Sequence, residues 1–184
     1  MKHKLIVLMG PDGSGKTTVA KSLVRHLRQK GVYVVYNHGH TYITSGNSFG
    51  IQEATLEKRR IFFQLLLPFA YFDNVFAFVF KYLFKKGTII SDRYLYDKAV
   101  RLAYYGILPA WLFSPYLRLL PRPDVIYCLD APEKSIVKRK SGMSREELVR
   151  YRRLYVKAAQ ILGAHIVNTD RPIKSTLKSI IPLL

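Results

Sequence analysis

Eight consecutive residues near the start of the chain have the types and spacing of a phosphate-binding loop. They read GPDGSGKT from position 10 to position 17 and match the pattern G-x-x-x-x-G-K-[ST] without a gap. Glycines at such positions let backbone N–H groups approach phosphate oxygens, because no Cβ stands in the way. The lysine can reach the outer phosphates, and the hydroxyl after it can bind Mg²⁺. The motif therefore predicts a nucleotide site with Lys16 and Thr17 at its reactive end.

The segments that flank this loop must supply the strand and the helix that position it. Leu5 to Met9 is a short apolar run with the length and composition of a buried strand. Thr17 to Lys30 reads as an amphipathic helix, with one apolar side formed by Val19, Leu23, Val24 and Leu27. The N-terminus of such a helix adds a partial positive charge beside the phosphates. A glycine-rich turn that binds nothing is the alternative, and the flanking strand and helix disfavour it.

A second group of charged residues follows a later apolar run. Thr88 to Ser91 reads as a strand, and Asp92, Arg93 and Tyr94 come directly after it. Open α/β sheets bind ligands at the carboxyl ends of their strands, so we expect this group to face the phosphate loop. A carboxylate in that place can act on Mg²⁺ or on the acceptor of a phosphoryl group. A purely structural ion pair between Asp92 and Arg93 is the alternative.

Strands and helices alternate along the rest of the chain. Further strands are expected at 32–36, 124–129 and 164–167. Helices are expected at 52–84 with an interruption at Pro68, then at 95–105, 110–120, 132–140 and 145–162, and from position 172 onward. Such alternation predicts an α/β fold of three layers, with a central parallel sheet of about five strands flanked by helices. A chain of 184 residues is expected to form a single domain over 1–184.

The composition narrows the class of protein and its partners. Hydrophobic residues make up 49% and charged residues 23%, which is typical of a globular chain. Cys128 is the only cysteine, which excludes a disulfide framework within the chain and favours a cytoplasmic location. The formal net charge of +18 favours acidic partners, namely nucleotides, nucleic acid or an anionic membrane surface. A general property of the source organism explains the charge equally well.

The most apolar segment of the chain is 69–84. Gln64, Asp73 and Asn74 interrupt the apolar residues in and around it, so no run reaches the roughly 18 residues that a membrane span needs. We therefore expect no transmembrane segment. The segment is expected to be a helix buried on several sides, through which two copies of the chain form a homodimer.

Three stretches, in this order and spacing, resemble the thymidylate kinases among the nucleoside monophosphate kinases. They are GPDGSGKTT, SDRYLYDKAVRLAYYG and PDVIYCLDAPEKSIVKRK. The resemblance implies a P-loop kinase that uses ATP and Mg²⁺ to phosphorylate a nucleoside monophosphate, with dTMP to dTDP as the first choice. A kinase of the same fold that acts on a nucleoside or another small acceptor is one alternative. A basic nucleic-acid-binding ATPase or polynucleotide end-kinase is an alternative of another class.

The resemblance also implies roles on the ATP side of the site. Lys16 would hold the ATP phosphates together with the loop residues Gly10, Asp12, Gly13, Ser14, Gly15, Thr17 and Thr18. Mg²⁺ would lie near Thr17 and Asp92. Arg139 would pack against adenine, beside the loop formed by Asn168 and Thr169. A short LID is expected near 138–146.

On the acceptor side, the resemblance implies that Asp12 faces the sugar hydroxyl and that Arg93 lies between the donor and acceptor phosphates. Tyr104 and Tyr105 would lie near the acceptor base, with simple packing as the alternative. Some members place an arginine directly after the acidic loop residue, whereas this chain has Gly13. We therefore expect the cation that neutralises charge on the transferring phosphoryl group to lie on the lid. The candidates are Lys138, Arg139, Lys140 and Arg145, with a solvated helix face as the alternative.

Two further stretches depart from the family pattern. After the second strand these kinases usually carry Arg-Glu-Pro-Gly-Gly, whereas this chain has the run 37–40, NHGH. His38 and His40 in that run lack an evident third ligand, which favours a loop lining over a metal site. Near the position of the family's acceptor-phosphate arginine, the chain has the run 72–74, FDN, with Arg59 and Arg60 as the nearest substitutes.

Overall fold

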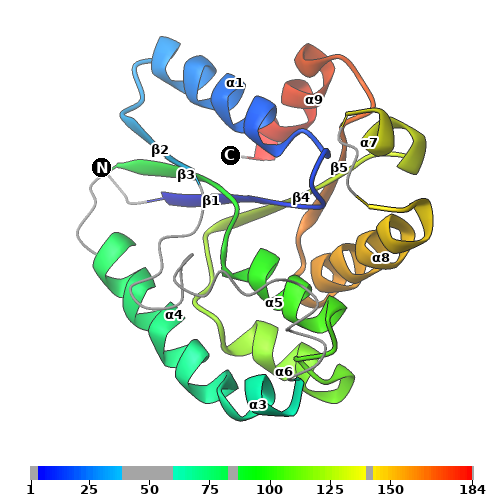
Figure 1. Cartoon of the computed structure of the whole chain (residues 1–184). Helices are drawn as coiled ribbons and strands as arrows, with labels where there is room; N and C mark the ends of the chain where they lie inside the picture. Colours follow the sequence, from blue (N-terminus) through cyan, green and yellow to red (C-terminus); the bar gives the residue numbers. More distant parts are fainter. Residues whose placement is uncertain (1–3, 39–59, 83–86, 140–142, 184) are drawn as a thin grey trace.

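The computed structural model describes residues 4–38, 60–82, 87–139 and 143–183. Their five strands form one all-parallel sheet with the order β2-β3-β1-β4-β5 (Figure 1). The strands are β1 Lys4–Met9, β2 Val34–His38, β3 Thr88–Asp92, β4 Val125–Asp130 and β5 His165–Asn168. The expected α/β fold with its parallel sheet of about five strands is confirmed.

Helices cover both faces of this sheet, as Figure 1 shows. They are α1 Lys16–Gln29, α3 Arg60–Leu65, α4 Leu67–Tyr82, α5 Leu95–Tyr104, α6 Ala110–Leu119, α7 Glu133–Arg139, α8 Arg145–Leu162 and α9 Ile173–Ile180, with a 3₁₀ turn at Ile181–Leu183. The interruption expected at Pro68 falls two residues earlier, between Leu65 and Leu67. Pro68 therefore lies in the first turn of α4. The N–H groups of a first turn have no partner within the helix, so the N–H that proline lacks costs no helical hydrogen bond.

The central strand β1 divides its side chains between two hydrophobic cores. Leu5, Val7 and Met9 pack into the core under α5, α6 and α8. Ile6 and Leu8 point to the opposite face and pack with residues of α1 and α9. This alternation is the period of two that a strand imposes on its side chains. Because β1 is covered on both sides, its carboxyl end holds the loop 10–15 on a rigid base.

The helix α4 is apolar on two opposite sides. Its inner side carries Leu67, Tyr71 and Phe78, which pack against the larger core. The outer side continues a row that begins on α3, and we call this row the outer stripe: Ile61, Phe62, Leu65, Phe69, Phe72 and Phe76. These six side chains are between 55% and 73% exposed, so within one chain only the inner side is buried. No helix in the described part of the chain has both the length and the apolar character to cross a membrane.

Candidate active site

The loop after β1 has the backbone conformation that its glycines were expected to permit. Gly10, Gly13 and Gly15 all have positive φ, at 145°, 87° and 86°. A Cβ on Gly10 would lie 2.3 Å from the carbonyl oxygen of Leu129 on β4, so no other residue fits there. Gly15 caps α1, and the N–H groups of the first turn of α1 open toward the loop. This arrangement provides the anion site that a helix N-terminus offers.

The ammonium group of Lys16 is held inside this loop. Its Nζ donates hydrogen bonds to the carbonyl oxygens of Gly10 at 2.6 Å and Pro11 at 2.8 Å. The carboxylate of Asp12 is 3.5 Å away, and Lys16 is only 5% exposed. Burial lowers the pKa of Lys16, while the carboxylates of Asp97 and Asp12 oppose that change. The positive charge predicted for the phosphate site therefore lies at the loop.

Arg93 pairs with Asp12 and not with its sequence neighbour Asp92. Its Nη2 donates to Asp12 Oδ1 at 2.6 Å, so the structural Asp92–Arg93 pair considered above does not form. Arg93 has a φ of +82°, a region that costs a non-glycine residue roughly 1–2 kcal/mol. Its N–H donates to the Leu8 carbonyl at 3.1 Å, and the Ser91 hydroxyl donates to its carbonyl at 2.8 Å. Strain of this kind gathers at functional sites.

Three donors converge on one carboxylate oxygen of Asp92, at the carboxyl end of β3. Oδ2 accepts from Thr17 Oγ1 at 2.6 Å, from His38 Nδ1 at 2.9 Å and from the Tyr36 hydroxyl at 3.3 Å. Asp92 is completely buried, and no residue that the structure describes bonds its other oxygen, Oδ1. A threonine hydroxyl beside a carboxylate oxygen is the hard oxygen donor set that Mg²⁺ prefers. The residues expected to hold the metal therefore fit it.

Asp97 is a candidate that the sequence analysis missed. It lies in the first turn of α5 and is buried. Its Oδ1 accepts from the Gly10 N–H at 3.4 Å and the Tyr155 hydroxyl at 3.0 Å, and its Oδ2 from the Tyr94 N–H at 2.9 Å. Burial raises the pKa of Asp97, and the nearby Lys16 acts against this. The sequence could have revealed Asp97 as a capping residue, because an acidic residue at the third helical position often bonds the N–H of the residue that caps the helix. Its bond to the phosphate loop is a tertiary contact, which a local pattern does not reveal.

The loop that follows β5 reaches the phosphate loop from the other side. Thr169 is buried, and its hydroxyl donates to the Ser14 carbonyl at 2.8 Å. Asn168 accepts from the Asp170 N–H at 2.8 Å and so shapes the turn. Arg139, at the end of α7, donates to the Thr169 carbonyl at 3.3 Å and lies 3.6 Å from Asp170. Arg139, Asn168 and Thr169, all expected near adenine, therefore lie together.

Tyr104 and Tyr105 end α5 and pack against aromatic and basic neighbours. Their rings are 5.1 Å apart in an edge-on arrangement, and Tyr104 meets Tyr151 of α8 in the same way at 5.0 Å. The guanidinium of Arg150 lies 5.1 Å from the Tyr104 ring. These contacts favour the packing interpretation, and a contact with the acceptor base stays a prediction.

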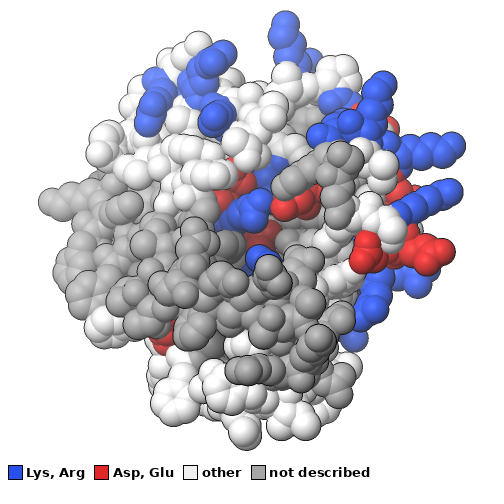
Figure 2. Space-filling model, in the orientation of Figure 1, with Lys and Arg blue, Asp and Glu red and all other residues white. Residues whose placement is uncertain are grey.

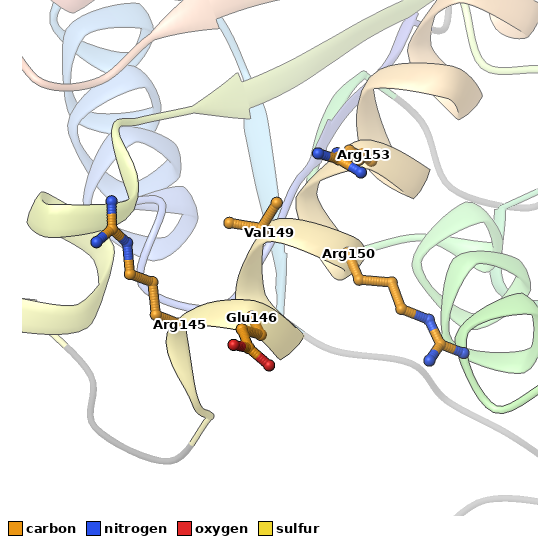
Figure 3. Close-up of a pocket in the computed structure, with 5 residues that line it drawn as sticks. All are labelled: Arg145, Glu146, Val149, Arg150 and Arg153. Atoms are coloured by element: carbon orange, nitrogen blue, oxygen red, sulfur yellow. The ribbon is translucent and has the colours of Figure 1, made fainter.

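The cations expected on the lid lie along α7 and the first turns of α8. Arg145 is exposed and lines a hollow of about 390 Å³ together with Glu146, Val149, Arg150 and Arg153 (Figure 3). Lys138 is exposed at the end of α7, whereas Lys140 lies outside the described residues. Figure 2 shows that Lys and Arg side chains project along the side of the molecule that carries these two helices. Among the lid cations that the structure describes, Arg139 contacts the turn after β5, and none contacts a residue of the phosphate loop.

The two stretches that depart from the family pattern have different surroundings. His38 is bonded to Asp92 and belongs to the site, which the loop-lining interpretation did not anticipate. Asn74 is buried on α4 and accepts a hydrogen bond from Lys98 at 3.3 Å, whereas Phe72 faces outward on the outer stripe. His40, Arg59 and the side chain of Arg60 lie outside the described residues.

Comparison with known proteins places this site in context. The sequence profile of the thymidylate kinase family matches residues 8–180. A probable thymidylate kinase of Pyrococcus abyssi is 29% identical over 100% of this chain and 97% of its own, and one of Thermococcus gammatolerans is 28% identical over 97% and 94%. A solved thymidylate kinase of Ehrlichia chaffeensis has a TM-score of 0.61 at 20% identity, covering 100% and 99% of the two chains. A deoxyadenosine kinase of M. mycoides with bound dCTP has a TM-score of 0.63 at 16% identity and covers 97% of each. At these identities the two solved structures show a shared fold.

Proposed function

The chain belongs to the thymidylate kinase family, and we propose that it transfers the γ-phosphoryl group of ATP to dTMP. A phosphate oxygen of dTMP forms the new bond to γ-phosphorus while the bond to the bridging oxygen breaks, which yields dTDP and ADP. The observation that carries the proposal is the meeting of Lys16, Arg93 and Asp92 at one edge of the sheet. Phosphoryl transfer needs mainly positioning and neutralisation of charge, and these residues supply both.

The donor side of the proposed site is the loop 10–18. Its glycine N–H groups and the N-terminus of α1 bind the ATP phosphates, and phosphate oxygens take over the Lys16 protons that now bond loop carbonyls. Thr17 and Asp92 would hold Mg²⁺, which would supply further positive charge beside the outer phosphates. Arg139 and the turn at Asn168 and Thr169 contact adenine.

The acceptor side of the proposed site begins at Asp12 and Arg93. Arg93 has its carboxylate partner on the loop itself, so it can exchange that partner for phosphate oxygens with little movement. Asp12, once released, can accept a hydrogen bond from a sugar hydroxyl of the acceptor. Arg145 on the lid is the proposed cation for the transferring group, because it is exposed at the start of α8. A LID near 138–146 and a cytoplasmic location are part of the proposal.

The experiment that tests the function measures ADP release from ATP against a panel of nucleosides, nucleoside monophosphates and oligonucleotides. We expect dTMP to give the highest kcat/KM. If a nucleoside gave the highest kcat/KM, the proposed acceptor would change from dTMP to that nucleoside. If DNA stimulated ATP turnover with a steep salt dependence, the protein would instead be a nucleic-acid-binding ATPase or end-kinase. Lys16→Ala should lose at least 10²-fold in rate, as expected when a charge on the transition state is removed. Lys21→Ala, an exposed lysine on the same helix, is the matched control.

We further propose that the outer stripe joins two copies of the chain. Six large side chains that are more than half exposed offer roughly 800 Å² of apolar surface, at about 200 Å² per full side chain. A standard interface needs roughly that area from each partner. The six residues of the stripe are all apolar, so contact between two stripes joins apolar surface to apolar surface.

A further inference from the structure

We propose that His38 is a positioning residue for Asp92. Its imidazole donates a hydrogen bond to Oδ2 of that carboxylate. The other oxygen, Oδ1, is then the one that binds the cation that accompanies the nucleotide. The inference rests on the proposed function, because it assigns a task within the same site. It concerns a residue that lies where the chain departs from the pattern of its family.

The register of the sheet brings these groups together. β2 and β3 are parallel neighbours, and His38 lies directly beside Asp92 at the end of the pair. Tyr36 is two residues earlier on β2 and therefore points to the same face as His38. Asn37, between them, points to the other face and donates to the Tyr82 hydroxyl at 2.7 Å and to the Ser91 hydroxyl at 2.9 Å. This anchored residue fixes the register, because a slip of one position would exchange the two faces.

The donors on Oδ2 divide the two carboxylate oxygens into different roles. A carboxylate accepts only, so His38 Nδ1, the Tyr36 hydroxyl and the Thr17 hydroxyl all donate to Oδ2. Burial and the charge of Asp92 raise the pKa of Tyr36 to about 12, so this phenol keeps its proton at neutral pH. With Oδ2 bonded three times, Oδ1 is the oxygen left for a cation; it is buried, and the described residues leave it without a partner.

His38 is also the solvent-exposed partner of the buried Asp92. Its side chain is 59% exposed, whereas Asp92 is completely buried. The ring stacks 6.2 Å from the ring of Tyr36, at an interplanar angle of 23°. Both rings thus cover the carboxylate from the direction of β2. Hydrogen bonds to a ligating carboxylate orient it, and their loss typically weakens metal binding 10- to 100-fold.

The test measures equilibrium binding of Mn²⁺, a paramagnetic substitute for Mg²⁺, in the presence of ADP, by electron paramagnetic resonance. We expect His38→Ala to weaken Mn²⁺ binding about 10-fold. His38→Asn, whose amide offers an N–H close to the place of Nδ1, should stay within about threefold of the original protein. Binding of ADP in the presence of a chelator should be unchanged in both variants. His165→Ala removes an exposed histidine of β5 and is the matched control.

Two results would overturn the inference while leaving the proposed function intact. One is Mn²⁺ binding by His38→Ala that equals the original protein. The other is an equal loss in His38→Asn and His38→Ala, because the ring and not its N–H would then matter. Tyr36→Phe provides a second check, since loss of one of the three donors should weaken Mn²⁺ binding without changing the affinity for metal-free ADP. Absence of Mn²⁺ binding and of dTMP turnover in the original protein would overturn the function and the inference together.

Discussion

Arg93 lies 2.6 Å from the carboxylate of Asp12, across the phosphate loop and away from the neighbouring Asp92. The contact joins the end of β3 to the loop after β1, and it places Arg93 next to the buried Lys16. Burial alone would lower the pKa of Arg93, but Asp12 and Asp97 outweigh it and raise that pKa. The guanidinium therefore stays charged, although half-buried, and it is ready to bind phosphate oxygens bidentately.

Replacing Arg93 by alanine is expected to lower kcat and kcat/KM for dTMP together, by about 10²-fold, because the lost contacts form in the transition state. Steady-state kinetics at saturating ATP measure this. Arg93→Lys should recover only part of the rate, since lysine lacks the planar fork. Arg118→Ala, an exposed arginine on α6, is the control and should keep both parameters. If Arg93→Ala kept a normal kcat but had a lower melting temperature, the role of Arg93 would be purely structural.

The lid arginines should separate in their kinetic effects. Arg139 contacts the turn at Thr169 and Asp170, so Arg139→Ala should raise the KM for ATP with kcat unchanged. Arg145→Ala should lower kcat and kcat/KM together if this cation meets the transferring group. Lys134→Ala, on the exposed side of α7, is the control. If both arginine variants stay within about twofold, well below the effect expected for such a charge, Arg93 becomes the main transition-state cation.

The outer stripe predicts a dimer that salt strengthens. Each chain carries a net charge of +18, so two copies repel each other most at low ionic strength. Light scattering should therefore give twice the 21.3 kDa chain mass, more completely at higher salt. Phe72→Glu should shift the mass to that of one chain, because it buries an unpaired carboxylate between the stripes. Ile166→Glu, at an exposed position of β5, should leave the dimer unchanged. A single-chain mass for the original protein at all concentrations would reject the interface.

Lys98 should make the stability depend on pH in the alkaline range. Burial lowers its pKa to about 8 from 10.5, and the nearby Asp73 opposes this. Between these two values the unfolded chain keeps the proton that the folded chain releases, so the contribution of Lys98 to the free energy of unfolding rises with pH. Compared with Lys98→Met, the original protein should gain about 2 kcal/mol between pH 7 and pH 10.

Urea unfolding of both proteins at each pH measures the Lys98 effect as a difference. The comparison matters because Cys128 acts in the opposite direction. Burial raises the pKa of its thiol to about 12, so this group lowers the stability once the unfolded chain loses the thiol proton near pH 9. That contribution is common to both proteins and cancels. If the free energy of unfolding changed with pH in the same way in both proteins, Lys98 would not be the cause of the pH dependence.

Local sequence patterns were sufficient to predict much of the fold and the phosphate loop 10–18. The strand β1, the glycines of the loop and the helix α1 follow one another without insertion, so their pattern alone predicted them. The strand β2 begins two residues later than expected, because the N–H of Val32 bonds the Leu27 carbonyl and still belongs to the end of α1. An apolar residue does not reveal which partner its backbone will choose.

The contacts that complete the candidate site could not be predicted, since they join distant parts of the chain. Asp97 meets Gly10 across 87 positions, and His38 meets Asp92 across 54. Arg93, which pairs with Asp12, has a positive φ that an arginine in the sequence does not suggest. Composition and periodicity describe segments, whereas these contacts follow from the strand order β2-β3-β1-β4-β5.

The bond from Thr169 to the Ser14 carbonyl joins positions 155 residues apart and has a consequence during synthesis. A ribosome releases the phosphate loop early, but the turn that supports it emerges only after β5 has been translated. A nascent chain therefore carries the loop sequence for most of its elongation without the support that the folded loop has. Because a ligand stabilises only the folded form that binds it, ATP in the cell can protect finished chains from proteolysis far better than growing ones.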